Sequence, residues 1–190
     1  MTEVKILMVG PKSSGKSSLA NFLADAVQNC ENPSMAPTKP TVGTRILEFD
    51  RTVRKGTGSV NVSVELWDVS GDRAYEAAWP AIMHGAMGAI YVYDAGNAGE
   101  EKDLDQWHRW FGQNMGFKDS QCMIMAHRKS QDVKPSRSAI PKSLAQVHVV
   151  STTLEESHDL IKEEFDRFLV HIETAAREMR QKEEQSVVGD

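Results

Sequence analysis

The apolar residues of this chain fall into short, nearly continuous runs that alternate with stretches of helical spacing. The first run, Val4–Val9, leads through a Gly-rich turn into Ser17–Asn29, where apolar residues recur with a helical period. This pattern predicts a buried strand that passes directly into a helix. The next stretch, Cys30–Pro40, holds three prolines together with Asn, Ser and Thr, which predicts an extended, mobile loop.

The middle of the chain predicts a β-hairpin. Two β-rich runs, Thr44–Arg54 and Ser59–Val69, are separated by the polar turn Lys55–Gly58. A hairpin inserted between a first strand and later ones supplies one antiparallel strand at the edge of a sheet.

The second half continues the alternation of strands and helices. Buried strands are predicted at Ala86–Asp94, Gln121–Ala126 and Gln146–Ser151, and helices at Leu104–Met115 and from Leu154 to about Gln185. Beyond Thr174 the last helix becomes mostly charged, so we expect it to leave the core. Alternating elements of this kind indicate an α/β fold, a mostly parallel six-stranded sheet with helices on both faces.

Composition narrows the function classes. A chain of 190 residues fits one domain that needs no disulfides or metals for its core. The formal charge of −5 argues against a general nucleic-acid or anionic-membrane binder, since both need a positive surface. The two cysteines, Cys30 and Cys122, match no disulfide or zinc pattern, and we expect a reducing, cytoplasmic compartment.

Neither end carries a membrane signal. Residue 2 is Thr rather than Gly, which excludes N-myristoylation, and the last residues include no prenylatable cysteine. We therefore expect no direct membrane anchor.

The chemistry of the chain begins at Gly10–Ser17, which matches G-x-x-x-x-G-K-[ST] and lies between a predicted strand and a predicted helix. Backbone N–H groups of such a loop curl around phosphate oxygens, and the helix N-terminus adds partial positive charge. We expect the lysine to reach the β- and γ-phosphates and the serine hydroxyl to ligate Mg²⁺. The predicted nucleotide contacts here are Ser13, Ser14, Gly15, Lys16, Ser17 and Ser18.

Two further segments complete a predicted phosphate and metal site. Asp68, at the end of a predicted strand, is expected to hold Mg²⁺ through water, and the Gly71 N–H to meet a γ-phosphate. Thr41 is expected to ligate Mg²⁺ from the preceding loop, and is favoured over Thr38 and Thr44. Together they predict a site that senses loss of the γ-phosphate.

These motifs in this order resemble a Rab or Ras-like small GTPase, over roughly residues 4 to 175. The resemblance rests on the P-loop, Pro40–Gly43, Trp67–Asp72, and Tyr91–Asn97 followed by a helix with Trp107. It implies a P-loop NTPase fold of the small-GTPase type, with GTP or GDP and Mg²⁺ as cofactors. Residues 1–175 then form the GTPase domain and 176–190 a charged helix end and tail. The implied switch segments are Pro33–Thr44 and Gly71–Met83.

A first departure from the family concerns hydrolysis. The family usually has glutamine directly after the glycine of D-x-x-G, where it orients the attacking water, and this chain has Asp72. An acid beside a negatively charged γ-phosphate is a poor catalytic replacement for a neutral amide. We expect slow intrinsic hydrolysis.

A second departure concerns the base, because the guanine-specifying N-K-x-D is absent. Ser130 stands where the family has its aspartate, and it cannot accept the same pair of hydrogen bonds. His127 can bond the base or brace the P-loop, and the stem of Arg128 can lie across the ring, with Lys129 beside it. Asp132 sits two places late.

The last purine-contacting motif is partly kept at Ser151 and Thr152. Guanine preference therefore follows from the resemblance to the family. Loss of one charge-assisted hydrogen bond predicts affinity weaker by about one to two decades than in a typical Rab.

A third departure is the missing lipid-anchor tail. Together with the degenerate base motif and charged terminal helix, it makes the chain similar to the Rab-like GTPase subunit of the intraflagellar transport B complex. That resemblance implies docking through the switch regions on a coiled-coil protein pair, and a role in building cilia or flagella. It also implies a location in the cytoplasm and in the cilium or flagellum and its base. The isolated chain is expected to be a monomer.

Other function classes stay open at this point. The chain can be a nucleotide-dependent binding module, a scaffold that binds its partner in any nucleotide state, or a conventional Rab-type trafficking GTPase with significant turnover. A P-loop phosphotransferase is disfavoured, because the sequence shows no arginine-rich lid or acceptor site.

Overall fold

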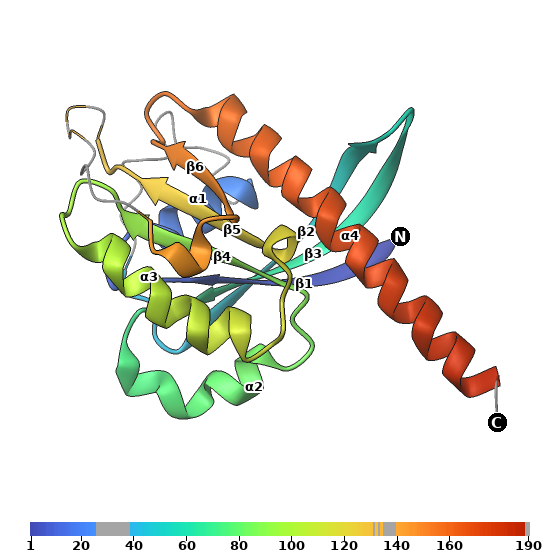
Figure 1. Ribbon diagram of the computed structural model, residues 1–190. Coiled ribbons are helices and arrows are strands. Elements are labelled where there is room, and N and C mark those ends of the chain that lie inside the picture. Colours follow the sequence, from blue (N-terminus) through green and yellow to red (C-terminus); the bar gives the residue numbers. More distant parts are fainter. Residues whose placement is uncertain (26–38, 131, 133, 135–139, 189–190) are drawn as a thin grey trace.

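The computed structural model describes residues 1–25, 39–130, 132, 134 and 140–188. Its centre is a six-stranded sheet in the order β2-β3-β1-β4-β5-β6 (Figure 1). β2 pairs antiparallel with β3, and every other neighbouring pair is parallel, which confirms the predicted fold class. The strands are β1 Thr2–Val9, β2 Thr44–Lys55, β3 Gly58–Val69, β4 Gly88–Asp94, β5 Cys122–His127 and β6 His148–Thr152.

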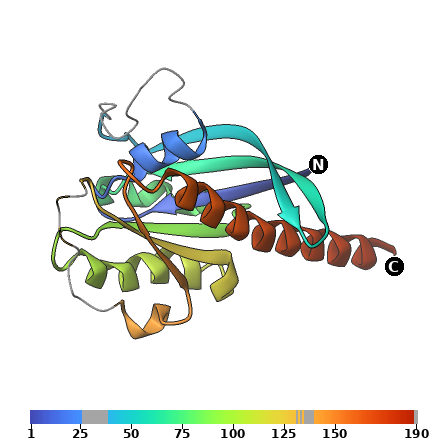
Figure 2. The ribbon, with the colours of Figure 1, turned by 90° about the horizontal axis from the view of Figure 1, so that it is seen from above.

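Helices cover both faces of the sheet, so the central strands are buried on both sides. α1 (Lys16–Leu23) and α4 (His158–Val188) pack on one face; α2 (Trp79–Met83) and α3 (Glu100–His108) pack on the other. Figure 2 shows α1 and α3 on opposite sides of the sheet. This double coverage explains why β1 and β4 appear in the sequence as nearly continuous apolar runs. No helix in the described part of the chain combines the length and apolarity that crossing a bilayer requires.

An aromatic cluster fixes the segment between β3 and β4. Trp79 at the start of α2 packs with ring-centroid distances of 4.8 Å to Trp110 and 4.9 Å to Phe111, and Trp107 lies 5.6 Å away. The 3₁₀ turn Arg73–Ala78 (η2) precedes α2 directly. These contacts hold the segment after Gly71 against α3 and the π-helical turn Arg109–Gln113 that follows it.

Three predicted helix boundaries are wrong. α1 ends at Leu23 rather than Asn29, because Ala24 caps it and Asp25 takes a left-handed φ of 48°; residues 26–29 lie outside the described part. α3 begins at Glu100, where acidic residues suit the helix dipole but interrupt the apolar period. α4 begins at His158 instead of Leu154.

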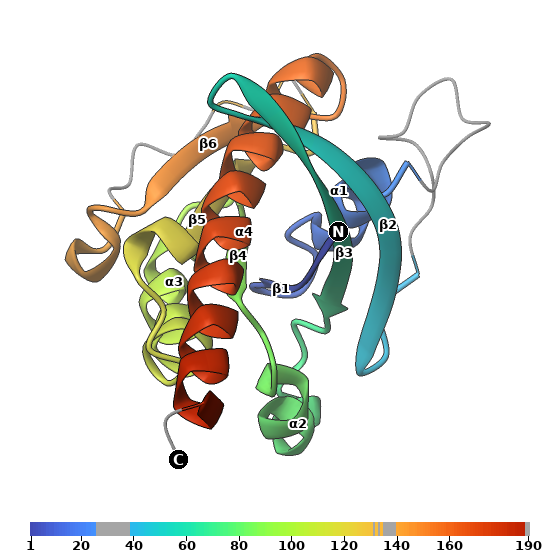
Figure 3. The ribbon, with the colours of Figure 1, turned by 90° about the vertical axis from the view of Figure 1, so that its right-hand side faces the viewer.

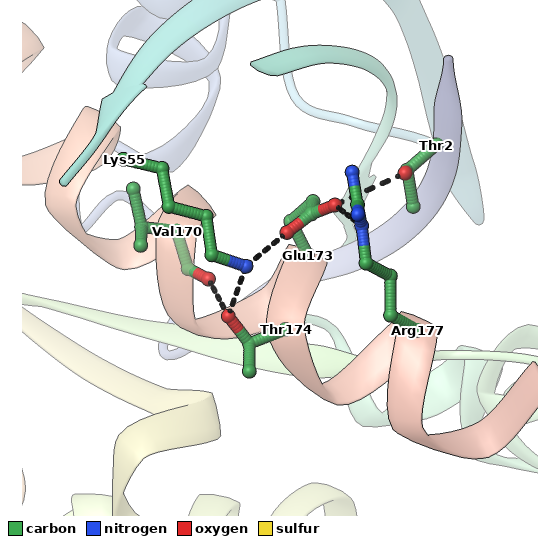
Figure 4. Close-up of polar contacts among 6 residues, drawn as sticks. All are labelled: Thr2, Lys55, Val170, Glu173, Thr174 and Arg177. Carbon is green, nitrogen blue, oxygen red and sulfur yellow. Dashed lines mark hydrogen bonds and ion pairs between the residues drawn. The ribbon is translucent and has the colours of Figure 1, made fainter. Parts of the chain in front are cut away.

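A buried carboxylate fastens α4 to the sheet (Figure 4). Glu173 has no exposed side-chain surface; it accepts a hydrogen bond from Lys55 Nζ of β2 at 2.7 Å, one from Thr2 Oγ1 of β1 at 3.2 Å and one from Arg177 Nε. Burial alone would raise the pKa of Glu173, but the hydrogen bonds from Lys55 and Arg177 outweigh it and lower the pKa. Beyond Ala176, which is fully buried, α4 continues past the sheet (Figures 1 and 3).

Candidate functional site

A cavity of about 380 Å³ opens at the carboxyl end of β1. It is lined by residues 12–17 of the P-loop, by residues 39–42 and 70–72, and by Tyr75. The carboxyl ends of parallel strands are where open α/β sheets bind ligands. Most of the predicted nucleotide-contacting residues outside the base motifs lie in this lining, whereas Ser18 does not.

The P-loop follows a backbone path that its glycines permit. Gly15 has a φ of 91°, in the left-handed region, and a Cβ there would lie 2.3 Å from Cδ2 of His127. Gly71, from the D-x-x-G segment, is pressed against the same loop, since a Cβ would lie 2.4 Å from the Lys12 backbone nitrogen. A larger residue at either position would displace the loop, so these two motif glycines are required by close contact.

Lys16 folds back over the P-loop. Its ammonium donates to the carbonyl oxygens of Gly10 at 2.9 Å and Pro11 at 2.6 Å, and the side chain is almost wholly buried. Burial lowers the pKa of Lys16 to about 8, against the opposing influence of Asp68 and Glu100. A cation held with so little water around it favours a polyanion that enters the cavity.

Ser17, Thr41 and Asp68, the three predicted magnesium ligands, converge. Ser17 Oγ donates to Asp68 Oδ2 at 2.7 Å, Thr41 Oγ1 donates to the same oxygen at 3.2 Å, and the two hydroxyls lie 2.9 Å apart. The other carboxylate oxygen, Asp68 Oδ1, is buried without a hydrogen-bond partner in the described part of the chain. Two hydroxyls and a carboxylate are hard oxygen donors of the kind that Mg²⁺ takes, so this donor set fits the ion.

The surroundings of this donor set separate the candidate threonines and reveal an extra cation. Thr44 opens β2, and its Oγ1 is buried without a hydrogen-bond partner in the described part of the chain. Thr38 lies outside the described residues. Arg45, which the sequence did not single out, places Nη2 3.2 Å from Asp68 Oδ2. A half-exposed arginine on a strand carries no motif that could have pointed to this contact.

Asp72 is engaged in a network of its own. It accepts a hydrogen bond from Ala74 N at 3.0 Å, as the cap of η2, and pairs with Lys12 Nζ at 2.8 Å. The hydrogen bond from Lys12 is the chief cause of a lowered pKa at Asp72, so the carboxylate is ionised and accepts but does not donate. Lys12 occupies a variable position of the P-loop motif, so the sequence pattern gave no indication of this pair.

His127 contacts the P-loop, one of the two roles predicted for it. The ring lies directly over Gly15, and Nδ1 is 3.1 Å from Thr152 Oγ1 in the adjacent strand. Burial lowers the pKa of His127 to about 4, which keeps the imidazole neutral near pH 7. The side chain therefore braces the loop against β6 without adding charge.

The remaining predicted base contacts lie beside the phosphate cavity, at the carboxyl ends of β5 and β6. The Arg128 backbone N–H donates to the Thr152 carbonyl at 2.9 Å, while Lys129 Nζ pairs with Asp94 Oδ2 at 2.8 Å. Ser151 is exposed and Thr152 is buried. Asp132 is exposed, and its backbone N–H donates to Ser130 Oγ at 3.3 Å.

The chain is similar to a known protein family and to solved structures. Residues 5–131 match the family described as Roc, the Ras of Complex domain of DAPkinase. The intraflagellar transport protein 22 homolog of Homo sapiens is 38% identical over 194 residues, covering 99% of this chain and all of that protein. The GTP-bound crystal structure of Trypanosoma brucei IFT22/74/81 matches with a TM-score of 0.73 and 32% identity, over 95% of this chain and 99% of that one. The GDP-bound T. brucei IFT22 crystal structure matches with a TM-score of 0.66 and 31% identity, over 90% of this chain and 97% of that one.

Proposed function

Because this chain belongs to the intraflagellar transport protein 22 family, with a Ras-like GTPase domain, we propose that it binds GTP and GDP with Mg²⁺ and serves as a nucleotide-dependent subunit of the intraflagellar transport complex. The observation that carries this proposal is the convergence of Ser17, Thr41 and Asp68 beside the buried ammonium of Lys16, at the mouth of the P-loop. The relatives solved with GTP and with GDP support it.

The residues divide the work of holding the nucleotide. Backbone N–H groups of residues 13–18 would surround the phosphates, and the Lys16 ammonium, which now donates to the carbonyl oxygens of Gly10 and Pro11, would donate to the β- and γ-phosphate oxygens instead. Ser17 and Thr41 would hold Mg²⁺ directly and Asp68 would hold it through water; the ion would supply positive charge that neutralises the phosphate oxygens. Thr41 and the Gly71 N–H both lie on the side of the cavity where the γ-phosphate would bind. Segments 39–44 and 71–83 therefore respond to the presence of that phosphate.

Hydrolysis by this site is slow. Asp72 is ionised, paired with Lys12 at 2.8 Å and fixed as a helix cap. An ionised carboxylate has no hydrogen to donate, unlike the amide of glutamine, and its charge opposes the approach of the negatively charged γ-phosphate. The chain therefore resembles a long-lived switch more than an enzyme of rapid turnover.

The partner is a protein of the intraflagellar transport B complex, a coiled-coil pair bound through segments 39–44 and 71–83. The T. brucei relative, whose structure carries the name IFT22/74/81, supports a protein partner from this complex. The working places are the cytoplasm and the cilium or flagellum with its base. Residues 1–175 act as the GTPase unit, and 176–190 as a charged extension.

Capture of the coiled-coil partner pair by wild-type and Ser17→Asn protein tests this proposal. Ser17→Asn removes a hydroxyl that the magnesium site needs, so GTP should bind about tenfold or more weakly, as expected for the loss of one charge-assisted interaction. The variant should therefore capture less partner than wild type. Ser143→Asn, an exposed serine far from the P-loop in sequence, is the matched control. Equal capture by all three proteins would show a scaffold that ignores its nucleotide.

A further inference from the structure

A carboxylate lies where the base motif lacks one. β5 and β6 are parallel neighbours, with His127 opposite Thr152, so the loops that follow them leave the sheet at the same edge. Ser130 and Glu155 each stand three residues beyond that pair, and Ser130 Oγ lies 3.5 Å from Glu155 Oε2. The chain therefore brings an acid from the loop after β6 to the position that would be an aspartate in N-K-x-D.

This edge adjoins the phosphate site. The His127 ring touches Gly15 of the P-loop on one side and bonds Thr152 Oγ1 on the other. A nucleotide whose phosphates lie in the P-loop therefore extends its base toward the ends of β5 and β6. Half-buried Glu155 is held there by its backbone N–H, which donates to Oγ1 of the buried Thr153 at 3.5 Å.

Two other carboxylates lie near this edge of the sheet. Asp94 pairs with Lys129 at 2.8 Å and accepts the Gly96 N–H at 2.9 Å. Asp132 is exposed. Ser130, which stands at the position of the missing aspartate, directs its hydroxyl to the carboxylate of Glu155.

We propose that Glu155 reads guanine in this chain, in place of the missing aspartate of the base motif. Guanine presents two donors on one edge, N1–H and the 2-amino group, and an ionised carboxylate offers two acceptor oxygens. Adenine presents a lone pair at N1, which a carboxylate repels. Ser130 supports the reading by donating to one carboxylate oxygen. This inference rests on the proposed nucleotide binding and adds the residue that gives it base specificity.

The test measures the affinities of GDP, IDP, XDP and ADP for nucleotide-free full-length protein by calorimetry. Wild type should bind GDP more tightly than IDP, which lacks the 2-amino group. Glu155→Gln should lower the affinity for GDP by about tenfold to a hundredfold, because a hydrogen bond to a charged acceptor contributes that much to binding. The same variant should bind XDP better than wild type does, because the glutamine amide donates to the 2-carbonyl oxygen.

A matched control and a rescue keep the test specific. Glu156→Gln changes the exposed neighbouring acid and should leave all four affinities unchanged. Adding Ser130→Asp to Glu155→Gln restores a carboxylate on the loop after β5 and should return the preference for GDP over IDP.

The outcomes separate this inference from the proposed function. If Glu155→Gln keeps the wild-type GDP to IDP ratio, or weakens all four nucleotides equally, Glu155 does not read the base and the inference is overturned. If wild type binds none of the four, the proposed function itself fails.

Discussion

Single charged residues set the chemical behaviour of the P-loop cavity. Lys16 is buried and has its pKa lowered to about 8, while Asp72 has its pKa lowered by the hydrogen bond from Lys12. One cation thus faces the cavity with little hydration, and one acid is fixed in its ionised form. We expect the first arrangement to favour binding of a polyphosphate and the second to slow its hydrolysis.

The hydrolysis rate is predicted to rise when Asp72 becomes glutamine. Asp72→Gln removes the charge, frees Lys12 and supplies an amide that can orient water, so single-turnover GTP hydrolysis should accelerate about tenfold or more. The control is Glu76→Gln, which makes the same acid-to-amide change within η2 at a solvent-exposed position. If wild type hydrolysed GTP as fast as Asp72→Gln does, Asp72 would not be the cause of slow hydrolysis.

The buried His127 predicts a pH dependence of stability. Its pKa falls from an ordinary value of about 6.5 to about 4 in the fold. The folded state holds the imidazole in its neutral form. Its contribution to the free energy of unfolding is therefore fully present above pH 6.5 and is lost as the pH falls through 4. The shift corresponds to on the order of 3 kcal/mol.

Urea unfolding across this pH range checks the prediction. His127→Asn should flatten the loss of unfolding free energy between pH 6.5 and 4, whereas His84→Asn, at an exposed position, should leave the wild-type slope. An unchanged slope in His127→Asn would show that this imidazole is not buried in its neutral form.

At the scale of elements, α4 depends on one buried carboxylate. Glu173→Gln removes the charge that Lys55 and Arg177 share and should lower the unfolding free energy at pH 7 by about 1–3 kcal/mol. That range is discounted from the full cost of a broken buried pair, because both cations are partly exposed.

The pH profile gives a second readout of Glu173. Its folded pKa is depressed, so its stabilisation is present above the unfolded pKa of about 4.5 and is lost as the pH falls through the lower folded value. Glu173→Gln should therefore lose less stability than wild type on acidification below pH 4.5. Glu178→Gln, an exposed acid on the same helix, should behave as wild type in both measurements; a matching loss in it would assign the effect to helix charge alone.

Elements buried on both faces could be predicted from the sequence, whereas those shaped by tertiary contacts could not. β1 and β4 were found because continuous burial leaves a continuous apolar run. The start of α3 at Glu100 was missed because its first turn is acidic and lacks apolar spacing. The convergence of Ser17, Thr41 and Asp68 followed from motif order, but the Lys12–Asp72 pair did not, because pairing of exposed side chains leaves no periodicity.

At the scale of the whole molecule, α4 links the two ends of the sheet. Its 31 residues, about 46 Å at the usual helical rise, begin at the edge that holds the candidate nucleotide site. They pass the hairpin tip at Lys55 and end beyond the opposite edge (Figure 1). Glu155 lies just before the start of this helix and Glu173 within it. Glu155, the proposed base-reading residue, therefore directly precedes the helix whose far end forms the charged extension.

The most direct test of this account is the GDP and GTP affinity of Lys16→Ala, measured beside Lys102→Ala, which changes an exposed lysine of α3. Loss of the buried ammonium should weaken both nucleotides by about a hundredfold or more, as expected for a charge-assisted contact to phosphate made in a dry site. Lys102→Ala should retain wild-type affinity. Full affinity in Lys16→Ala would contradict phosphate binding at this loop, and with it the proposed function.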